Sequence, residues 1–309
     1  MKRTLMLPVA LAFVTLTARP AWAWDGFGHQ LVARIAWENM TPQARGRAIA
    51  VLQGAAQDTR LLQGFGTGTL TPQQQVRLFM AGATWPDDVR PPDSRGAKYH
   101  VRDRHFTDLF WRQSYDFGPF HDDSRPPAGD LLNDFAGLRT QVTGPDHEQA
   151  AVALAWLLHL VGDIHQPLHA SGRITPSEPD GDQGGNLYKL EHITADRQRT
   201  LHSVWDNIIT SNARRLPGEA DDAFMTRIAT ETMHRHPRSE FAAEMGQTDV
   251  SQWARASVHL AQRRVYRAPL HRNQAASTTY RNAAFHAADP RIALAGYRLA
   301  DLLNQVLGS

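Results

Sequence analysis

The sequence predicts a mainly α fold: a single helical domain with a few short strands and long loops. Three observations support this. Apolar residues recur at helical spacing along most of the 309 residues, strand signals are few and short, and nothing between the strong helical segments near the two ends resembles an interdomain linker. Hydrophobic residues make up 42% of the chain, which is enough for a sizeable core.

Nine segments carry the helical pattern, and a few others carry strand or loop signals. The helices are expected at residues 28–40, 41–53, 72–83, 128–142, 146–165, 202–213, 218–235, 249–266 and 289–307. Short strand signals occur at Phe106–Leu109 and Leu187–His192. Clusters of Pro and Gly predict loops at residues 86–97, 116–128 and 171–185.

Residues 1–23 have the layout of a secretory signal peptide. Two basic residues precede a largely apolar stretch over residues 4–18, and Ala21-Trp22-Ala23 forms a small-x-small cleavage site. An uncleaved anchor or a short core helix is the alternative, but the apolar stretch is short for a membrane helix and no stop-transfer pattern follows it. We therefore expect cleavage before Trp24 and export to the periplasm or the medium, with residues 24–309 forming the mature domain.

Removal of this peptide changes the charge balance. The chain has 33 basic and 31 acidic residues, and residues 1–23 hold three of the basic residues and no acidic ones, so 30 basic residues remain and the net charge falls to about −1. Such a chain has no global basic field that would hold duplex nucleic acid. It also contains no cysteine, which excludes zinc fingers and thiolate catalysis, whereas its 15 histidines favour a metal site built from His, Asp, Glu and terminal groups.

The segment Ala150–His169 carries the strongest chemical signal. Its helix is apolar all round, which is typical of a buried helix, yet it contains His159 and Asp163 at i and i+4, on one face. A buried carboxylate costs several kcal/mol unless it is paired or bound to a metal. A hydrogen bond between the two side chains in the core is the simpler explanation if this pair is taken alone.

A second pair of the same kind weakens that simpler explanation. His202 and Asp206 again stand at i and i+4 in an apolar helix, and imidazole with carboxylate suits Zn²⁺. Trp24 and His29 follow the cleavage site, where a free α-amine becomes a ligand only after cleavage; an ordinary helix start is the alternative.

Two further motifs contain acidic residues. Asp87 and Asp88 lie at a predicted helix end, with Arg90 three residues after Asp87, and a solvated C-terminal turn is the plain alternative. The second motif is His105-Phe106-Thr107-Asp108.

Taken together and in this order, the motifs resemble the zinc-dependent single-strand nuclease family typified by nucleases S1 and P1. The chain is more distantly similar to bacterial zinc phospholipases C. The resemblance runs from Trp24 to Asn304. It rests on Trp at the cleavage point, Trp-x-Asp-x-x-Arg, His-Phe-x-Asp, His-x-x-x-Asp followed by Gln-Pro-Leu-His, Gly-Gly-Asn, and Leu-His-x-x-Trp-Asp.

The resemblance implies an all-helical fold of the phospholipase C/P1 nuclease type and three zinc ions per chain. The first zinc would be bound by Asp87, His105, His159 and Asp163. The second would be bound by the amine and carbonyl of Trp24, by His29 and by the bridging Asp163. The third would be bound by His169, His202 and Asp206.

The resemblance also implies the substrate contacts. Phe106 would stack on a base, Asp108 would hydrogen-bond its edge, Arg90 would clamp phosphate, and Asn186 would help to shape the cleft. Asp87, Asp163 and Arg90 would act in catalysis.

Three positions need separate comment. His100 also fits a His-apolar-x-Asp pattern and remains an alternative ligand, although Phe106 and Asp108 favour His105. Ala256 stands where the family often carries Glu. His165 is not expected to be a ligand, because two residues after Asp163 on a helix its side chain points well away from it.

The implied activity is endonucleolytic hydrolysis of single-stranded DNA and RNA to 5′-phosphorylated products by a monomer without a membrane anchor. Two zinc ions about 3.5–4 Å apart would activate the attacking water, and the third would stabilise the leaving 3′ oxygen. A base reaches a stacking aromatic only when it is unpaired. Nothing identified senses the 2′-OH. A zinc phospholipase C and a non-catalytic zinc-binding protein are the alternatives, and base preference and 3′-nucleotidase activity stay open.

Overall fold

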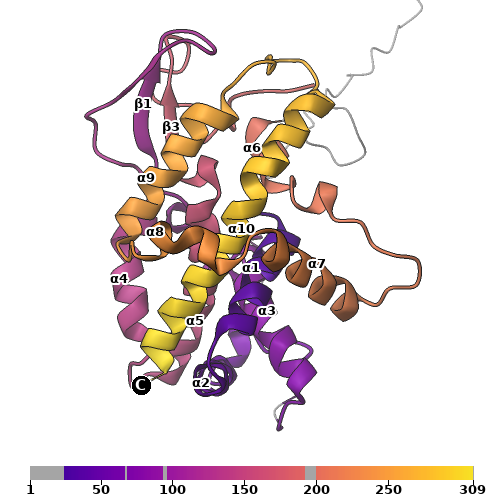
Figure 1. The fold of residues 1–309 in the computed structure, drawn as a ribbon. Coiled ribbons are helices and arrows are strands. Elements are labelled where there is room, and N and C mark those ends of the chain that lie inside the picture. The colour runs from indigo at the N-terminus through magenta and orange to yellow at the C-terminus, as the bar shows by residue number, and fades with distance from the viewer. Residues whose placement is uncertain (1–23, 67, 93–95, 192–199, 309) are drawn as a thin grey trace, which may run out of the picture.

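The computed structural model describes residues 24–66, 68–92, 96–191 and 200–308 (Figure 1). The predicted signal peptide, residues 1–23, lies outside the described residues. Within the described ranges the chain is predominantly helical and contains three short strands, so the prediction of a mainly α fold is confirmed.

The helices differ in length from four to 30 residues. Their bounds are α1 Gly26–Asn39, α2 Pro42–Gln53, α3 Pro72–Asp88, α4 Leu131–Gln141, α5 His147–His165, α6 Leu201–Asp206, α7 Asp221–Arg235, α8 Ala242–Met245, α9 Val250–Leu260 and α10 Thr278–Leu307. Two 3-10 helices matter for the site, η3 Arg102–His105 and η4 Pro167–His169. No helix in the part of the chain that the structure describes is long and apolar enough to span a membrane.

Helix α5 is the central element of the fold. The Asp146 side chain caps its start by accepting from the backbone N–H groups of Glu148 and Gln149. From Ala153 to His165 every residue is buried, because α1, α2, α3, α4, α9 and α10 all pack against the helix. The helix predicted as apolar all round is therefore the central helix of the core. Its polar side chains, His159, Asp163 and His165, are buried together with the apolar ones.

The strands form a small sheet of order β2-β1-β3 at one end of the helical body (Figure 1). Strand β1 (Leu109–Gln113) pairs antiparallel with β2 (Phe120–Asp122) and parallel with β3 (Ser171–Ile174). The strand expected at residues 106–109 is thus shifted along the chain, because Asp108 makes only an isolated bridge.

Two other predictions in this region were wrong. Strand β3 lies inside the loop predicted at residues 171–185. It forms because it follows η4 into the core, where all four of its residues are buried and Arg173 pairs with Asp116. In the strand predicted at Leu187–His192, Lys189 makes an isolated bridge to Thr200, and His192 lies outside the described residues.

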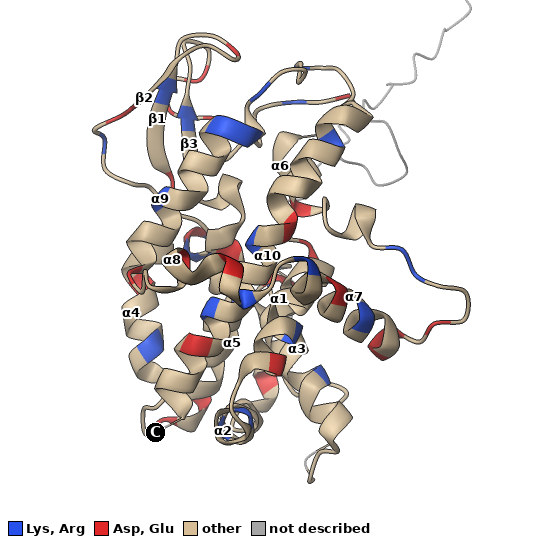
Figure 2. Ribbon diagram, in the orientation of Figure 1, with Lys and Arg blue, Asp and Glu red and all other residues tan. Residues whose placement is uncertain are grey.

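Several predicted helix ends were also misplaced. Helix α10 begins at Thr278, where Ser277 caps it, and continues through Pro290, which the sequence pattern treated as a start. Helix α3 continues through Pro86 to Asp88. The helix predicted at 202–213 ends at Asp206 and is followed by a 3-10 turn. In Figure 2 basic and acidic residues are interspersed over the helices, in keeping with the near-neutral charge.

Candidate metal centre

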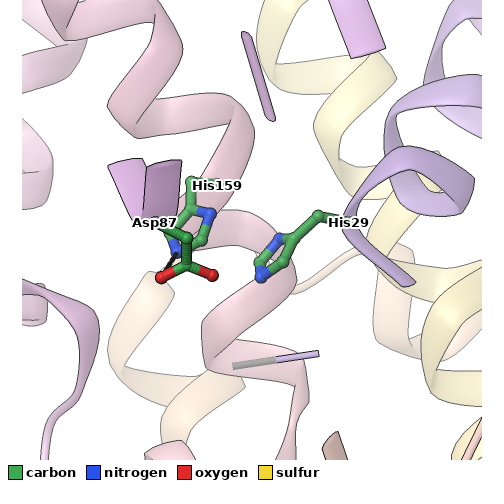
Figure 3. A group of neighbouring side chains, drawn as sticks. All are labelled: His29, Asp87 and His159. Atoms are coloured by element: carbon green, nitrogen blue, oxygen red, sulfur yellow. Dashed lines mark ion pairs between the residues drawn. The ribbon is translucent and has the colours of Figure 1, made fainter. Parts of the chain in front are cut away.

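His159 and Asp163 lie one turn apart on α5, and both side chains are fully buried. The Nε2 atom of His159 is 3.2 Å from Oδ2 of Asp163. Three neighbouring elements bring further ligand types to this face: α1 brings His29, the last turn of α3 brings Asp87, and the end of η3 brings His105. Figure 3 shows His29, Asp87 and His159 pointing toward one another.

Asp163 lies between two of these imidazoles. Its Oδ1 is 3.4 Å from Nε2 of His29, and its Oδ2 is 3.4 Å from Nδ1 of His105. Asp87 Oδ1 is 3.8 Å from ring nitrogens of both His105 and His159. The five side chains form two overlapping groups, His29–Asp87–His159 and His105–His159–Asp163, and within each group the ligand atoms lie within 4.8 Å of one another.

A third group lies beside the first two. It consists of His169 from η4 with His202 and Asp206 from α6, and its ligand atoms also lie within 4.8 Å of one another. His202 Nε2 is 3.5 Å from Asp206 Oδ2, and His169 Nε2 is 4.0 Å from Asp206 Oδ1. His169 also reaches back to Asp163, with Nδ1 3.8 Å from Oδ1. The two i, i+4 pairs found in the sequence therefore meet in space.

Backbone carbonyls orient three of the imidazoles. The Nδ1 atoms contact carbonyl oxygens at 2.7–2.8 Å, in the pairs His159–Ala83, His169–His105 and His202–Gly184. If Nδ1 donates in each case, the Nε2 atom of each ring carries a free lone pair, which is available to bind a metal. The Nε2 atoms of His169 and His202 face each other at 3.1 Å. Two ligands at 2.0–2.1 Å from a tetrahedral Zn²⁺ are about 3.3 Å apart, so this juxtaposition fits a shared cation.

Orphaned polar atoms concentrate at the same place. Among the described residues, these buried atoms have no hydrogen-bond partner: both ring nitrogens of His29, Nε2 of His105, Oδ2 of Asp87, both carboxylate oxygens of Asp163 and Oδ2 of Asp206. Such groups are costly to bury unless something satisfies them. A set of nitrogen and oxygen donors without sulfur suits Zn²⁺. The residues present thus fit a metal.

Burial also sets the protonation of these side chains. It lowers the pKa of His105 to about 4, against the opposing effect of Asp163, and the pKa of His202 to about 3, with the help of His169. Both rings are therefore neutral at pH 7, which is the ligand form. Burial raises the pKa of Asp206 well above its usual range, and a nearby cation would lower it again.

Two supporting residues were missed by the sequence reasoning. Gly162 faces His29, and a Cβ at that position would lie 2.7 Å from Nδ1 of the ring. Gln166 donates from Nε2 to Asp206 at 2.6 Å while its Oε1 accepts from the N–H of Leu168 at 2.6 Å. A glycine in the interior of a helix lowers helix stability by about 1 kcal/mol relative to Ala. The presence of Gly162 inside an apolar helix could therefore have indicated that space is needed there.

Gly162→Ala is expected to displace the His29 ring and to lower metal content and any metal-dependent activity at least about tenfold, as changes to the groups that position a metal ligand do. The measurement is metal per chain by elemental analysis, together with the Tm. Gly137→Ala is the matched control, because Gly137 also lies in a helix and a Cβ there meets nothing within 4 Å. Equal metal content in the two variants would contradict the role given to Gly162.

The predicted substrate residues lie next to this centre in the chain. Phe106 follows η3 directly and is half-buried. Gly129, at φ +85°, lies against it so closely that a Cβ there would be 2.7 Å from the ring. Asp108 is 9% exposed, and burial together with the charge of Asp182 raises its pKa well above its usual range.

The other two predicted contacts are already held by protein groups. Arg90 donates from NH2 to Oδ1 of Asp87 at 2.5 Å, and its side chain is 13% exposed. This ion pair connects Arg90, the predicted phosphate-binding residue, with Asp87 of the His29–Asp87–His159 group. Asn186 donates to the carbonyl of Gln183 at 3.0 Å, within the Gly184-Gly185-Asn186 loop.

Three remaining positions are placed as follows. His105, and not His100, belongs to a group of ligand atoms, although the two rings are only 5.6 Å apart. His165 donates from Nδ1 to the carbonyl of Val161 and lies outside all three groups. Trp24 is fully buried, and the N–H of Asp25 donates to the carbonyl of Asp206 at 3.0 Å, which places the start of the described chain beside the third group.

Comparison with known proteins finds similarity over most of the chain. A family model described as S1/P1 nuclease matches residues 24–308. Endonuclease 4 of Arabidopsis thaliana is 28% identical over 265 residues, which are 78% of this chain and 81% of that protein. Endonuclease 3 of the same plant is 26% identical over 97% of this chain and 95% of its own length. Nuclease S1 of Aspergillus oryzae is 24% identical over 72% and 64%.

Proposed function

Because the chain belongs to the S1/P1 nuclease family, we propose that it is a zinc-dependent endonuclease that hydrolyses single-stranded DNA and RNA to 5′-phosphorylated products. The observation that carries this proposal is the meeting of three groups of buried His and Asp side chains, each with its ligand atoms within 4.8 Å of one another. We further propose that the enzyme acts as an exported monomer after removal of residues 1–23.

We assign three zinc ions to this centre. One is held by Asp87, His105, His159 and Asp163, and one by His169, His202 and Asp206. The remaining ion is held by His29, Asp163 and the amine and carbonyl of Trp24. Support comes from the position of Asp163. Its Oδ1 lies 3.4 Å from His29 and its Oδ2 lies 3.4 Å from His105, and these two imidazoles are assigned to different zinc ions.

Zinc ions bound here supply Lewis acidity, which activates water and offsets the charge of the phosphodiester. The chain supplies the geometry. Asp163 would fix the relative placement of the two neighbouring sites. Asp87 holds Arg90, whose positive charge would offset the charge that develops on the phosphoryl oxygens. No side-chain nucleophile is required.

The preference for single strands follows from Phe106 and from the charge of the protein. A base stacks on an aromatic ring only when it is unpaired, and a chain with net charge near −1 has little attraction for a rigid duplex. None of the proposed contacts involves the 2′-OH, so we expect both DNA and RNA to be cleaved.

Phe106→Ala is expected to lower kcat/KM on single-stranded DNA about 10–100-fold, because stacking on an aromatic ring contributes about 1–3 kcal/mol per base. Zinc content should remain that of the unmodified protein. Phe285→Ala is the matched control, since Phe285 is another half-buried aromatic but lies on α10. An unchanged kcat/KM for Phe106→Ala would remove the base-stacking role.

The proposed substrate is tested by supplying heat-denatured DNA, duplex DNA and phosphatidylcholine vesicles in parallel. We expect rapid cleavage of the denatured DNA, slow cleavage of the duplex and no hydrolysis of the lipid. Cleavage of the lipid alone would identify a phospholipase C instead. Bound zinc without any chelator-sensitive hydrolysis would identify a non-catalytic zinc-binding protein.

One residue added ahead of Trp24 is expected to remove the proposed amine ligand, to lower zinc content from about three to about two per chain, and to reduce activity at least about tenfold, as the loss of a metal contact does. Elemental analysis and initial rates measure both effects. The control is protein processed to begin at Trp24. Full zinc content and full activity in the extended protein would overturn the assignment of the amine but leave the His–Asp groups untouched.

A further inference from the structure

Two arginines of α10 converge behind the C-terminal end of α5. Arg291 and Arg298 are seven residues apart, so they lie on the same face of the helix, two turns apart. Arg298 is 3% exposed. It donates from NH1 to Nε2 of His165 at 2.9 Å and from NH2 to the carbonyl of Glu244 at 2.7 Å, and it lies 4.8 Å above the ring of Trp253.

Arg291 reaches the same region from the other turn. It donates from NH2 to Oγ of Ser257 at 3.3 Å, and that hydroxyl in turn donates to the carbonyl of Ile164 at 2.5 Å. The Nε atoms of both Arg291 and Arg298 are buried and have no acceptor among the described residues. Each guanidinium therefore has a buried Nε–H group without an acceptor.

The two positive charges also have no counter-charge in contact with them. Within the described ranges, no carboxylate oxygen lies within 4.0 Å of either guanidinium, whereas the fully buried Arg173 pairs with Asp116 at 2.5 Å. Glu244, the acid whose charge acts on both arginines, gives Arg298 only its backbone carbonyl. His165 accepts from Arg298 through a neutral ring, because its other nitrogen faces the carbonyl of Val161.

Both arginines remain charged at neutral pH. Burial lowers the pKa of Arg291 to about 10 and that of Arg298 to about 9, and both values are still above 7. A buried guanidinium without a counter-charge, such as that of Arg298, is strongly unfavourable. Nucleic-acid phosphate does not relieve this, because Arg298 is 3% exposed and is covered by the ring of Trp253.

We propose that Arg291, Arg298, His165, Ser257 and Trp253, which we call the arginine cluster, bind a small monovalent anion of the halide class. A spherical anion accepts N–H groups from any direction, which suits two Nε–H donors that come from different turns of one helix. Ala256 on α9 is half-buried and lies three residues after Trp253, on the same face of the helix, so a longer side chain at this position is expected to reach the cluster.

The bound anion would stabilise the C-terminal end of α5, which lies two residues beyond Asp163. It would do so independently of catalysis, because none of the five residues belongs to the three groups of metal ligands. Binding to the folded state alone raises the Tm once the anion concentration exceeds the Kd, and the Tm then continues to rise with the logarithm of that concentration.

The experiment compares the zinc-loaded mature protein in sodium chloride and in sodium gluconate at equal ionic strength. We expect the Tm to be about 2–4 °C higher in chloride and to rise with the logarithm of the chloride concentration. Ala256→Glu places a carboxylate beside the cluster and should remove this dependence, whereas Ala256→Gln, its uncharged counterpart, should keep it. Chloride that binds zinc affects both variants alike, so the difference between them reports on the cluster.

Crystals grown in sodium bromide give the direct test. An anomalous peak within about 3.5 Å of the Nε atoms of Arg291 and Arg298 is the expected result. Wild-type crystals without such a peak would overturn the proposal. So would an equal chloride dependence in Ala256→Glu and Ala256→Gln, because it would assign the effect to salt in general.

Discussion

Asp163→Asn is expected to lower kcat/KM on single-stranded DNA by at least about 10³-fold, the largest effect of any single substitution considered. Each loss of 1.36 kcal/mol in transition-state stabilisation is tenfold in rate, and metal-ion stabilisation amounts to several kcal/mol. Asp163 makes the closest approaches of any carboxylate in the centre, with imidazole nitrogens of His29, His105 and His159 at 3.2–3.4 Å. An amide removes the charge and turns an N–H₂ group toward these nitrogens.

The measurement pairs initial rates with zinc per chain, because the proposed role predicts that both fall. Asp222→Asn is the control: Asp222 pairs with Arg77 at the surface, so its loss should leave rate and zinc content unchanged. If Asp163→Asn retained its zinc and its rate, Asp163 would be an ordinary buried carboxylate and the shared-ligand assignment would fail.

The helical pairs show what sequence reasoning can reach. His159 with Asp163, and His202 with Asp206, were found because helical spacing places i and i+4 on one face whatever the tertiary structure. A buried helix that carries such a pair must satisfy it locally or with a ligand. Helical spacing does not give the distance between the two helices. The sequence therefore could not show that the two His–Asp pairs converge beside Asp163 in the folded chain.

The residues that were missed act through contacts between distant segments. Gly162 makes room for a ring from α1, and Gln166 orients a carboxylate on α6, and neither relation has a fixed spacing along the chain. Strand β3 was missed for the same reason, because its pairing with β1 buries a Ser-Gly-Arg segment that carries no strand signal of its own. Pro290 misled the placement of α10, since burial against α5 and α1 outweighs the propensity of one residue.

Removal of zinc by a chelator is expected to lower the Tm by at least about 10 °C as well as to abolish activity. A ligand present at about 1,000 times its Kd stabilises the folded state by about 4 kcal/mol, and we propose three such ions for this fold. Without them the orphaned atoms of Asp163 and His29 stay buried and unsatisfied. Thermal unfolding with and without chelator, followed by readdition of zinc, measures the effect. A Tm that does not change would show that the centre folds without metal.

The metal-free protein should also become less stable as the pH falls below about 6.5. The folded-state pKa is about 4 for His105 and about 3 for His202, both lowered by burial, whereas these side chains titrate near 6.5 in the unfolded chain. Between these values the unfolded state binds more protons, so stability falls with falling pH and this contribution levels off below about pH 3. Urea unfolding of chelated protein from pH 7.5 to pH 4.5 measures the slope. A flat profile would mean that these rings reach solvent, and a neutral, preorganised set of imidazole ligands would then no longer explain the affinity for zinc.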